Sequence, residues 1–460
     1  MRKLGRHSGG ETGSGRGMIR RVAAALVLTL ALTGCGLPFR EAGNWEFLSR
    51  IGEEMPGTGA PNGSVAAADE SSAPADEAAD EYSAAVPEAA REAKVLTWQS
   101  LLGTQEQEEE PEDPYTDPMA WEYCFQYLDE PGQQWYRDIQ RILAGMGQEQ
   151  ELSAESLEAG LTEEDIDRIF CYVLADHPEY FYVDGYRYTK YSRMDKLIKI
   201  TFSGSYTYDS QECDARWKQI QEAAEALLAR APHGEDDYEK VRYVYETLIR
   251  NTDYVLDAPD SQNLYSVLVN GASVCQGYAK ATQYLLNHLG IPCVLVQGQV
   301  EPGEGHAWNL LCLDGEYYYM DTTWGDASYR QAEGDSLQEE GTPQVNYDYL
   351  CVTTRQLLRT HVPGQDVPLP ECTATEGNYY VREGCMFSAC EEEALQQAFD
   401  RAISEGRQEI SLKCTEEEVY RELLDHLVEQ KEVFSYLGPD CSTLHYARNE
   451  KQLSITFWFS

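Results

Sequence analysis

A cysteine, a histidine and an aspartate far apart in the sequence have residue types and local settings suited to acyl transfer. Cys275 begins a run whose apolar positions recur at helical intervals, so we place its thiol in the first turn of a buried helix. The dipole and unpaired N–H groups at a helix start favour thiolate, lowering a cysteine pKa from about 8.5 to roughly 3.5–7.5. These N–H groups can also stabilise an oxyanion. Cys275 is therefore a candidate nucleophile, although a lone cysteine at a helix start more often only fills a core.

The other two residues lie on a predicted hairpin. Asp314-Gly315 separates two strand-like runs, His306–Leu313 and Glu316–Asp321, and Asp-Gly between such runs predicts a two-residue turn. In that register His306 and Asp321 project from the same face as diagonal neighbours, within side-chain reach. A one-residue bulge would move one of them to the other face.

Together these groups predict a nucleophile, a base and an orienting group. Cys275 would attack a carbonyl, and His306 would take the thiol proton and later give it to the leaving amine. Asp321 would fix the orientation of the imidazole. General acid–base help of this kind is worth about 10²–10⁴-fold in rate.

Three motifs around these residues resemble the transglutaminase-like superfamily. They are Val274-Cys275-Gln276-Gly277-Tyr278-Ala279, Gly305-His306-Ala307-Trp308-Asn309 and Met320-Asp321-Thr322-Thr323-Trp324-Gly325-Asp326. The resemblance covers roughly residues 236–330. It implies the family's catalytic triad at Cys275, His306 and Asp321. It also implies a papain-like α+β core, in which the nucleophile helix packs on an antiparallel sheet that bears the other two residues.

The resemblance leaves the reaction partner open, because the superfamily includes transglutaminases, proteases, other amide hydrolases and members without an assigned activity. We expect a peptide or protein amide substrate, with water or an amine as acceptor. We expect no cofactor and no metal, since no calcium loop or zinc motif is present. The alternative is a non-catalytic surface module that holds a peptide or glycan in the same cleft.

Composition excludes other classes of function. The chain has 460 residues, with 36 Lys and Arg against 79 Asp and Glu, giving a formal charge of −43. A nucleic-acid binder that acts through the phosphate backbone needs clustered basic residues, so we expect no nucleic-acid partner. No apolar run reaches the roughly 18–20 residues that span a bilayer.

The N-terminal segment predicts export and lipid anchoring. A basic start at Ile19-Arg20-Arg21, an apolar run over Val22–Leu32 and small residues before a cut site are typical of a secretory signal, with Met18 as the expected start. Leu32-Thr33-Gly34-Cys35 resembles the lipobox of bacterial lipoproteins, which implies lipid attachment at Cys35. The protein is therefore expected outside the cytoplasmic membrane, held there by its N-terminal lipid.

The rest of the chain divides into a spacer and three globular stretches. The fold class expected is α+β, with the transglutaminase-like core flanked by two smaller α+β domains. The spacer is acidic and has little to bury, which predicts disorder. The expected boundaries are 1–35 for the signal, 36–118 for the spacer, 119–232 for the N-terminal domain, 233–362 for the core and 363–460 for the C-terminal domain.

Several local predictions concern the flanking stretches. Helical spacing predicts one helix over Trp121–Gly145, whereas Asn378–Arg382 is expected to be a strand. His177 beside Asp176 could form a dyad, but a histidine at a helix end next to proline is more often structural.

The remaining cysteines do not pair completely. Apart from Cys35 and Cys275, 11 of the 13 cysteines remain, an odd number. Cys293 and Cys312 are expected in the core. One or two disulfides are possible among the five cysteines of the C-terminal stretch, which are Cys372, Cys385, Cys390, Cys414 and Cys441.

Overall fold

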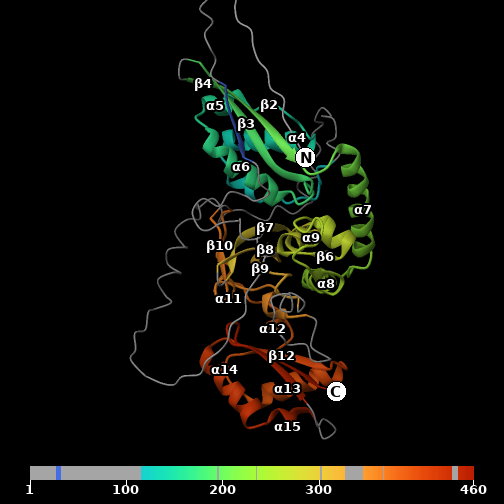
Figure 1. The fold of residues 1–460 in the computed structure, drawn as a ribbon. Coiled ribbons are helices and arrows are strands. Elements are labelled where there is room, and N and C mark those ends of the chain that lie inside the picture. The colour runs from blue at the N-terminus through green and yellow to red at the C-terminus, as the bar shows by residue number, and fades with distance from the viewer. Residues whose placement is uncertain are drawn as a thin grey trace, which may run out of the picture.

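The computed structural model describes residues 27–32, 115–193, 196–234, 236–300, 303–326, 345–365, 367–437 and 444–459. They form three bodies stacked one on another (Figure 1), which we call the N-terminal body (115–228), the central body (237–363) and the C-terminal body (367–459). Among these residues no helix has both the length and the apolar character needed to cross a membrane. Most of the predicted spacer and the predicted lipid site Cys35 lie outside the described residues.

The N-terminal body packs helices against a twisted sheet. Its helical elements are η2 (Cys124–Tyr127), α4 (Glu130–Ala144), α5 (Ala154–Glu158), α6 (Glu163–Asp176) and α7 (Ser210–Leu228). The single helix expected over 121–145 is wrong before residue 130, where the chain forms the short 3₁₀ helix η2 and then leaves the helical conformation at Leu128 and Asp129. The carboxylate of Asp129 accepts a hydrogen bond from Gly132 N at 3.0 Å and so caps a new helix, α4, with Pro131 in its first turn. Helix α7, the last element of the N-terminal body, extends along the central body and contacts η3 (Ser266–Asn270) and α9 (Cys275–His288) there (Figure 1).

The N-terminal sheet has the strand order β1-β3-β4-β2. Its strands are β1 (Val27–Leu32), β2 (Gln150–Glu151), β3 (Val183–Arg193) and β4 (Lys196–Tyr206). β1 lies inside the predicted signal segment and pairs antiparallel with β3.

The central body places one helix against an antiparallel sheet. The sheet order is β10-β7-β8-β9, with β7 (Cys293–Val300), β8 (Glu304–Leu313), β9 (Glu316–Met320) and β10 (His361–Pro363). Helix α9 (Cys275–His288) lies between α8 (Asp237–Asn251) and the strands β7 and β8, which is why it is buried on nearly every side. The shorter elements are β5 (Asp253–Tyr254), η3 (Ser266–Asn270), β6 (Ala272–Ser273), η4 (Tyr347–Tyr349) and α11 (Thr354–Leu357). The boundary expected after residue 362 falls within β10.

The C-terminal body has a sheet of order β11-β12-β14-β13 covered by helices. Its elements are α12 (Tyr379–Arg382), β11 (Met386–Phe387), α13 (Glu392–Ser404), β12 (Glu409–Cys414), α14 (Glu417–Leu424), η5 (Asp425–Glu429), α15 (Val433–Leu437), β13 (Leu444–Asn449) and β14 (Ser454–Phe459).

The strand expected over Asn378–Arg382 is wrong, because this segment forms the helical turn α12. The side chain of Asn378 accepts a hydrogen bond from Tyr380 N at 3.1 Å and caps the turn. The ring of Tyr379 stacks on Tyr347 of the central body, with ring centroids 3.8 Å apart. The strand-like run of Tyr379, Tyr380 and Val381 thus forms a capped turn that packs on the central body.

Candidate active site

The helix α9 begins at Cys275, as the sequence predicts, and its thiol is half-buried. The preceding residue, Val274, has an extended backbone and offers no side-chain cap. The N–H groups of a first helical turn have no intrahelical acceptor, so this end of α9 presents donors and a positive dipole end beside the sulfur.

Gly277 allows the start of α9 to pack closely against the preceding loop. A Cβ at this position would lie 2.0 Å from Ser273 Oγ and 2.9 Å from Ser261 O. The Ser273 hydroxyl is itself held by a 2.8 Å hydrogen bond to Ser261 O. A side chain at 277 would therefore push the helix start, and Cys275 with it, out of position.

The hairpin β8–β9 forms in the predicted register. Leu313 pairs with Glu316 and Asn309 with Met320, with no bulge between these pairs. β9 ends at Met320, so Asp321 follows the strand directly, and its backbone N–H donates to Tyr349 O at 3.0 Å.

The three predicted residues come together in the central body. His306 Nε2 lies 2.7 Å from Asp321 Oδ2, and the side chains of His306 and Cys275 share a hydrogen bond. Because Nε2 faces Asp321, the ring nitrogen left for the thiol is Nδ1. The other carboxylate oxygen, Asp321 Oδ1, accepts the backbone N–H of Trp324 at 3.0 Å.

Burial makes the charges of this group depend on each other. The side chains of His306 and Asp321 are 3% and 0% exposed. Burial alone would lower the pKa of His306, but the charge of Asp321 and hydrogen bonds with Asp321 and Cys275 raise it to about 10. Burial alone would raise the pKa of Asp321, whereas the charge and hydrogen bond of His306 hold it below its usual range. An imidazolium paired with a carboxylate is thus the favoured state.

Other residues of the three motifs support this arrangement. Asn309 Nδ2 donates to Ala279 O at 2.9 Å and so ties β8 to α9. Tyr278 donates its hydroxyl proton to Asp326 Oδ2 at 2.6 Å, which ties the start of α9 to the segment after β9. The motif residues therefore hold the helix and the hairpin in one fixed relation.

Comparison with known proteins identifies the family of a segment that covers much of the central body. Residues 226–322 match the transglutaminase-like superfamily. This segment is a transglutaminase-like domain. The match confirms the family and the α+β core that the three motifs predict.

The curated relatives of this transglutaminase-like domain extend well beyond the aligned segment. The kyphoscoliosis peptidases of Mus musculus and Homo sapiens are 27% and 24% identical to the chain over 143 residues. That alignment covers 28% of this chain and 21% of each relative, so the chain spans about a fifth of the length of the curated relatives it matches.

Solved structures also overlap with part of the chain. A TGase structure is 16% identical with a TM-score of 0.23, covering 33% of this chain and 46% of that one. The periplasmic domain of TgpA from Pseudomonas aeruginosa is 17% identical with a TM-score of 0.20, covering 30% of this chain and 62% of that one.

The central body holds a fourth residue that the sequence analysis missed. His361, the first residue of β10, places Nε2 2.9 Å from Asp321 Oδ2, the oxygen that His306 also contacts. Its side chain is 0% exposed. His361 lies 40 residues beyond Asp321 and outside the three motifs, so neither spacing nor periodicity indicated it.

His306, Asp321 and His361 are the only group of three potential metal ligands found among the described residues, with ligand atoms within 4.8 Å of one another. The distances of 2.7 and 2.9 Å to Oδ2 match charge-assisted hydrogen bonds. Ligands about 2.0–2.1 Å from a tetrahedral zinc ion would stand about 3.3 Å apart. The arrangement therefore fits shared protons better than a shared metal ion.

His177, which the sequence analysis considered as one half of a dyad with Asp176, contacts other residues. Its Nδ1 lies 2.7 Å from Glu179 Oε1 and its Nε2 lies 3.1 Å from Gln140 Nε2. Asp176 instead accepts backbone hydrogen bonds from Cys124 and Phe125, at 2.9 and 3.1 Å. Asp176 therefore joins η2 to α6, whereas His177 contacts Glu179 and Gln140 of α4, so the two residues do not form a dyad.

The described cysteines are all free thiols. Cys293 and Cys312 are buried, as expected for core residues. Cys372, Cys385, Cys390 and Cys414 form no disulfide, and Cys441 lies outside the described residues.

Proposed function

We propose that this protein is a cysteine enzyme that acts on amide bonds of cell-wall or surface peptides through a thioester at Cys275. The observation that carries the proposal is the contact chain that runs from the buried Asp321 through the buried His306 to the half-buried thiol of Cys275. The name of the curated relatives, which are peptidases, supports amide chemistry.

The reaction follows from the geometry. The Cys275 sulfur attacks the amide carbonyl carbon, and first-turn N–H groups of α9 stabilise the oxyanion. The C–N bond breaks as His306 gives its proton to the leaving amine, which leaves a thioester. Water or a second amine, deprotonated by His306, then attacks the thioester carbonyl. The C–S bond breaks and the sulfur leaves as a thiolate beside the protonated His306.

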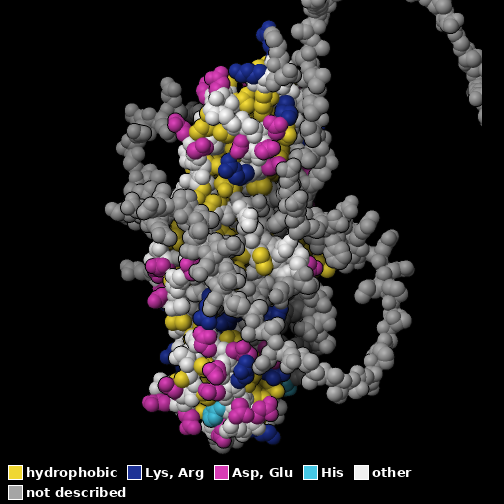
Figure 2. Space-filling model, turned by 90° about the vertical axis from the view of Figure 1, so that its left-hand side faces the viewer, with side chains coloured by type: hydrophobic (Ala, Val, Ile, Leu, Met, Phe, Trp, Pro, Cys, Tyr) yellow, Lys and Arg dark blue, Asp and Glu magenta, His cyan; other side chains and the backbone are white. Residues whose placement is uncertain are grey.

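Surface charge bears on the substrate. On the face drawn in Figure 2, Asp and Glu side chains gather over the lower end, where the C-terminal body lies, with fewer Lys and Arg between them. A net charge of −43 should repel anionic wall polymers and favour neutral or basic peptides.

Trapping the acyl-enzyme tests the proposal. Wild type and Cys275→Ala are incubated with wall peptides, quenched in acid and digested for mass spectrometry. We expect an acyl adduct on Cys275 in wild type and none in the variant. Iodoacetamide labelling near pH 7 is the second measurement. A Cys275 that reacts no faster in the native than in the denatured chain would contradict the proposal, as would equal peptide binding by both proteins without turnover.

The anchor is part of the proposal and has its own test. We infer that Cys35 carries a lipid that holds the enzyme outside the cytoplasmic membrane, because the lipobox-like segment Leu32-Thr33-Gly34-Cys35 follows a signal-like run. Cys35→Ser should release the protein from the detergent phase in phase partition and abolish labelling by a fatty-acid analogue. Labelling that persists in Cys35→Ser would exclude this attachment site.

A further inference from the structure

His361 is enclosed at the point where the central and C-terminal bodies meet. The rings of Trp308, Trp324 and Tyr349 surround it, with centroids 5.0, 4.8 and 5.4 Å from its own. Its ring contacts Asp321 through Nε2 and Thr360 Oγ1 through Nδ1, at 2.9 and 2.8 Å. Both ring nitrogens are therefore engaged, and substrate has no access to this buried side chain.

The protonation of His361 follows from its partners. Burial, aided by the charge of His306, keeps the pKa of His361 below its usual value, so the ring is neutral. Asp321 is ionised and can only accept, which puts the single ring proton of His361 on Nε2. Nδ1 must then accept. The hydroxyl of Thr360 is its donor, because Nδ1 at 2.8 Å is a closer acceptor for that single proton than Leu357 O at 3.5 Å.

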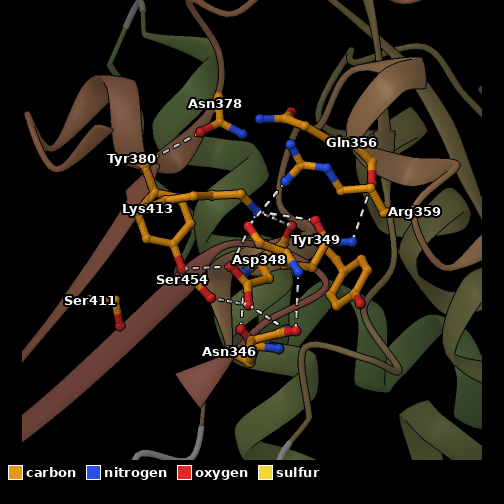
Figure 3. Close-up of polar contacts among 12 residues, drawn as sticks. Asn346, Asp348, Tyr349, Gln356, Arg359, Asn378, Tyr380, Ser411, Lys413 and Ser454 are labelled. Atoms are coloured by element: carbon orange, nitrogen blue, oxygen red, sulfur yellow. Dashed lines mark hydrogen bonds and ion pairs between the residues drawn. The ribbon is translucent and has the colours of Figure 1, made fainter. Parts of the chain in front are cut away.

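This chain of donors continues into the C-terminal body. Gln452 donates from Nε2 to Thr360 Oγ1 at 3.3 Å, and its Oε1 accepts from Lys413 Nζ at 3.3 Å. Lys413 also lies 3.2 Å from Asp348 Oδ1, and the two side chains are 0% and 2% exposed. Figure 3 shows Lys413 reaching from the C-terminal body toward Asp348 of the central body.

The donors all point the same way. The amide of Gln452 donates to Thr360, Thr360 donates to His361, and His361 donates to Asp321. Successive hydrogen bonds in a buried network polarise and strengthen one another. Asp348, at the other end of this network, is held firmly, because its Oδ2 also accepts hydrogen bonds from Asn449 and Ser454 at 2.8 and 2.7 Å.

We propose that His361 is a positioning residue that fixes the carboxylate of Asp321, and that the C-terminal body supports the Nε2–H tautomer of His361 through Gln452 and Thr360. This inference rests on the proposed function, since its effect on chemistry passes through Asp321 and His306 to Cys275. With His361 in place, Oδ2 is held by two rings and Oδ1 by the backbone of Trp324, so the carboxylate cannot rotate away from His306. Without it, Oδ2 keeps one donor and the imidazolium loses its fixed partner.

The titratable groups near His361 are few. Asp321, His306 and Tyr349 face it, and Tyr245 also lies near the charge of Asp321. The tyrosines stay neutral below pH 10, because burial raises the pKa of each above its usual value. A change in the pH dependence of Cys275 on substitution of His361 therefore reports on Asp321 and His306.

The test measures the alkylation rate of Cys275 against pH in the full chain, by iodoacetamide and peptide mass spectrometry, which needs no substrate. The variants are His361→Leu, which removes the donor, and His361→Gln, which keeps a donor and an acceptor. Thr360→Val removes the hydroxyl that donates to Nδ1 of His361 while keeping the side-chain shape. His426→Leu, a histidine of the C-terminal body that contacts Tyr436, is the control.

In His361→Leu we expect the inflection of the alkylation rate of Cys275 against pH to move up by about one pH unit. At pH values below the inflection, the alkylation rate should then be about ten-fold lower than in wild type. Thr360→Val should shift the inflection less in the same direction, whereas His361→Gln should stay within about two-fold of wild type and His426→Leu should not change. If His361→Leu does not fold, judged by its melting temperature, Thr360→Val decides.

Two results would contradict the inference, and they are distinguishable. A wild-type Cys275 that reacts no faster than in the denatured chain overturns the proposed function and the inference with it. A fast wild-type Cys275 whose profile is unmoved, or moves to lower pH, in folded His361→Leu and Thr360→Val overturns the inference alone.

Discussion

His306 and Asp321 meet in the interior of the central body, with Nε2 2.7 Å from Oδ2, although 15 residues separate them along the chain. The two-residue turn between β8 and β9 brings them together, and burial removes the water that would screen their charges. Each group is therefore charged because the other is, and four predictions follow from this region and its supports.

The stability contributed by His306 should depend on pH. Its pKa rises from 6.5 in the unfolded chain to about 10 in the fold, so its charged contacts stabilise the fold fully below pH 6.5 and are lost as pH rises toward 10. Asp321 has a lowered pKa, so its contribution is lost as pH falls below about 3.8. The melting temperature of wild type should exceed that of His306→Gln most between pH 4 and 6.5, and the gap should close toward pH 10. A gap that widens with rising pH would contradict this assignment.

Asp321→Asn should lower the activity of the site while the protein still folds. An amide has only one accepting oxygen, and Asp321 uses both carboxylate oxygens, Oδ2 for two rings and Oδ1 for Trp324 N. Either orientation of the amide sets an N–H group against another donor. We expect amide cleavage to fall about 10²–10⁴-fold, with the fold retained by circular dichroism. Activity within about two-fold of wild type would show that the orienting contact is not needed.

Gly277→Ala should disturb the start of α9. The new methyl group would lie 2.0 Å from Ser273 Oγ, and such overpacking typically costs about 1–3 kcal/mol. We expect a lower free energy of unfolding in urea and slower alkylation of Cys275. Gly234→Ala is the matched control, because nothing lies within 4 Å of a Cβ there. Equal stability of the two variants would contradict this prediction, because it would mean that the loop before α9 can move aside without a cost in stability.

Lys413→Ala should weaken the junction between the central and C-terminal bodies. Burial lowers the pKa of Lys413, and the charge of Asp348 offsets this only in part. Removing one partner of a buried ion pair strands the other, at a cost of about 3–5 kcal/mol. Urea unfolding should show this loss. Lys218→Ala, where the side chain is 77% exposed, should change stability by less than about 0.5 kcal/mol.

Local sequence was enough to predict the helix of Cys275 and the hairpin of His306 and Asp321. Helical spacing after residue 275 and the Asp314-Gly315 turn act over a few residues, and the observed register matches the expected one. Local pattern failed at Asn378–Arg382, which forms a capped helical turn that stacks on Tyr347.

The sequence by itself was therefore enough to predict Cys275, His306 and Asp321 as candidate nucleophile, base and orienting acid, and to predict the family of their domain. A helix start and a two-residue turn are encoded by neighbouring residues. Only the tertiary structure decided that His361 shares Asp321 and that Gln452 and Lys413 lie behind it. β10 pairs with β7 through contacts between distant segments, and the network needs the C-terminal body packed in place. Hydrogen bonds between residues so far apart leave no periodic trace in the chain, since they depend on how whole elements pack.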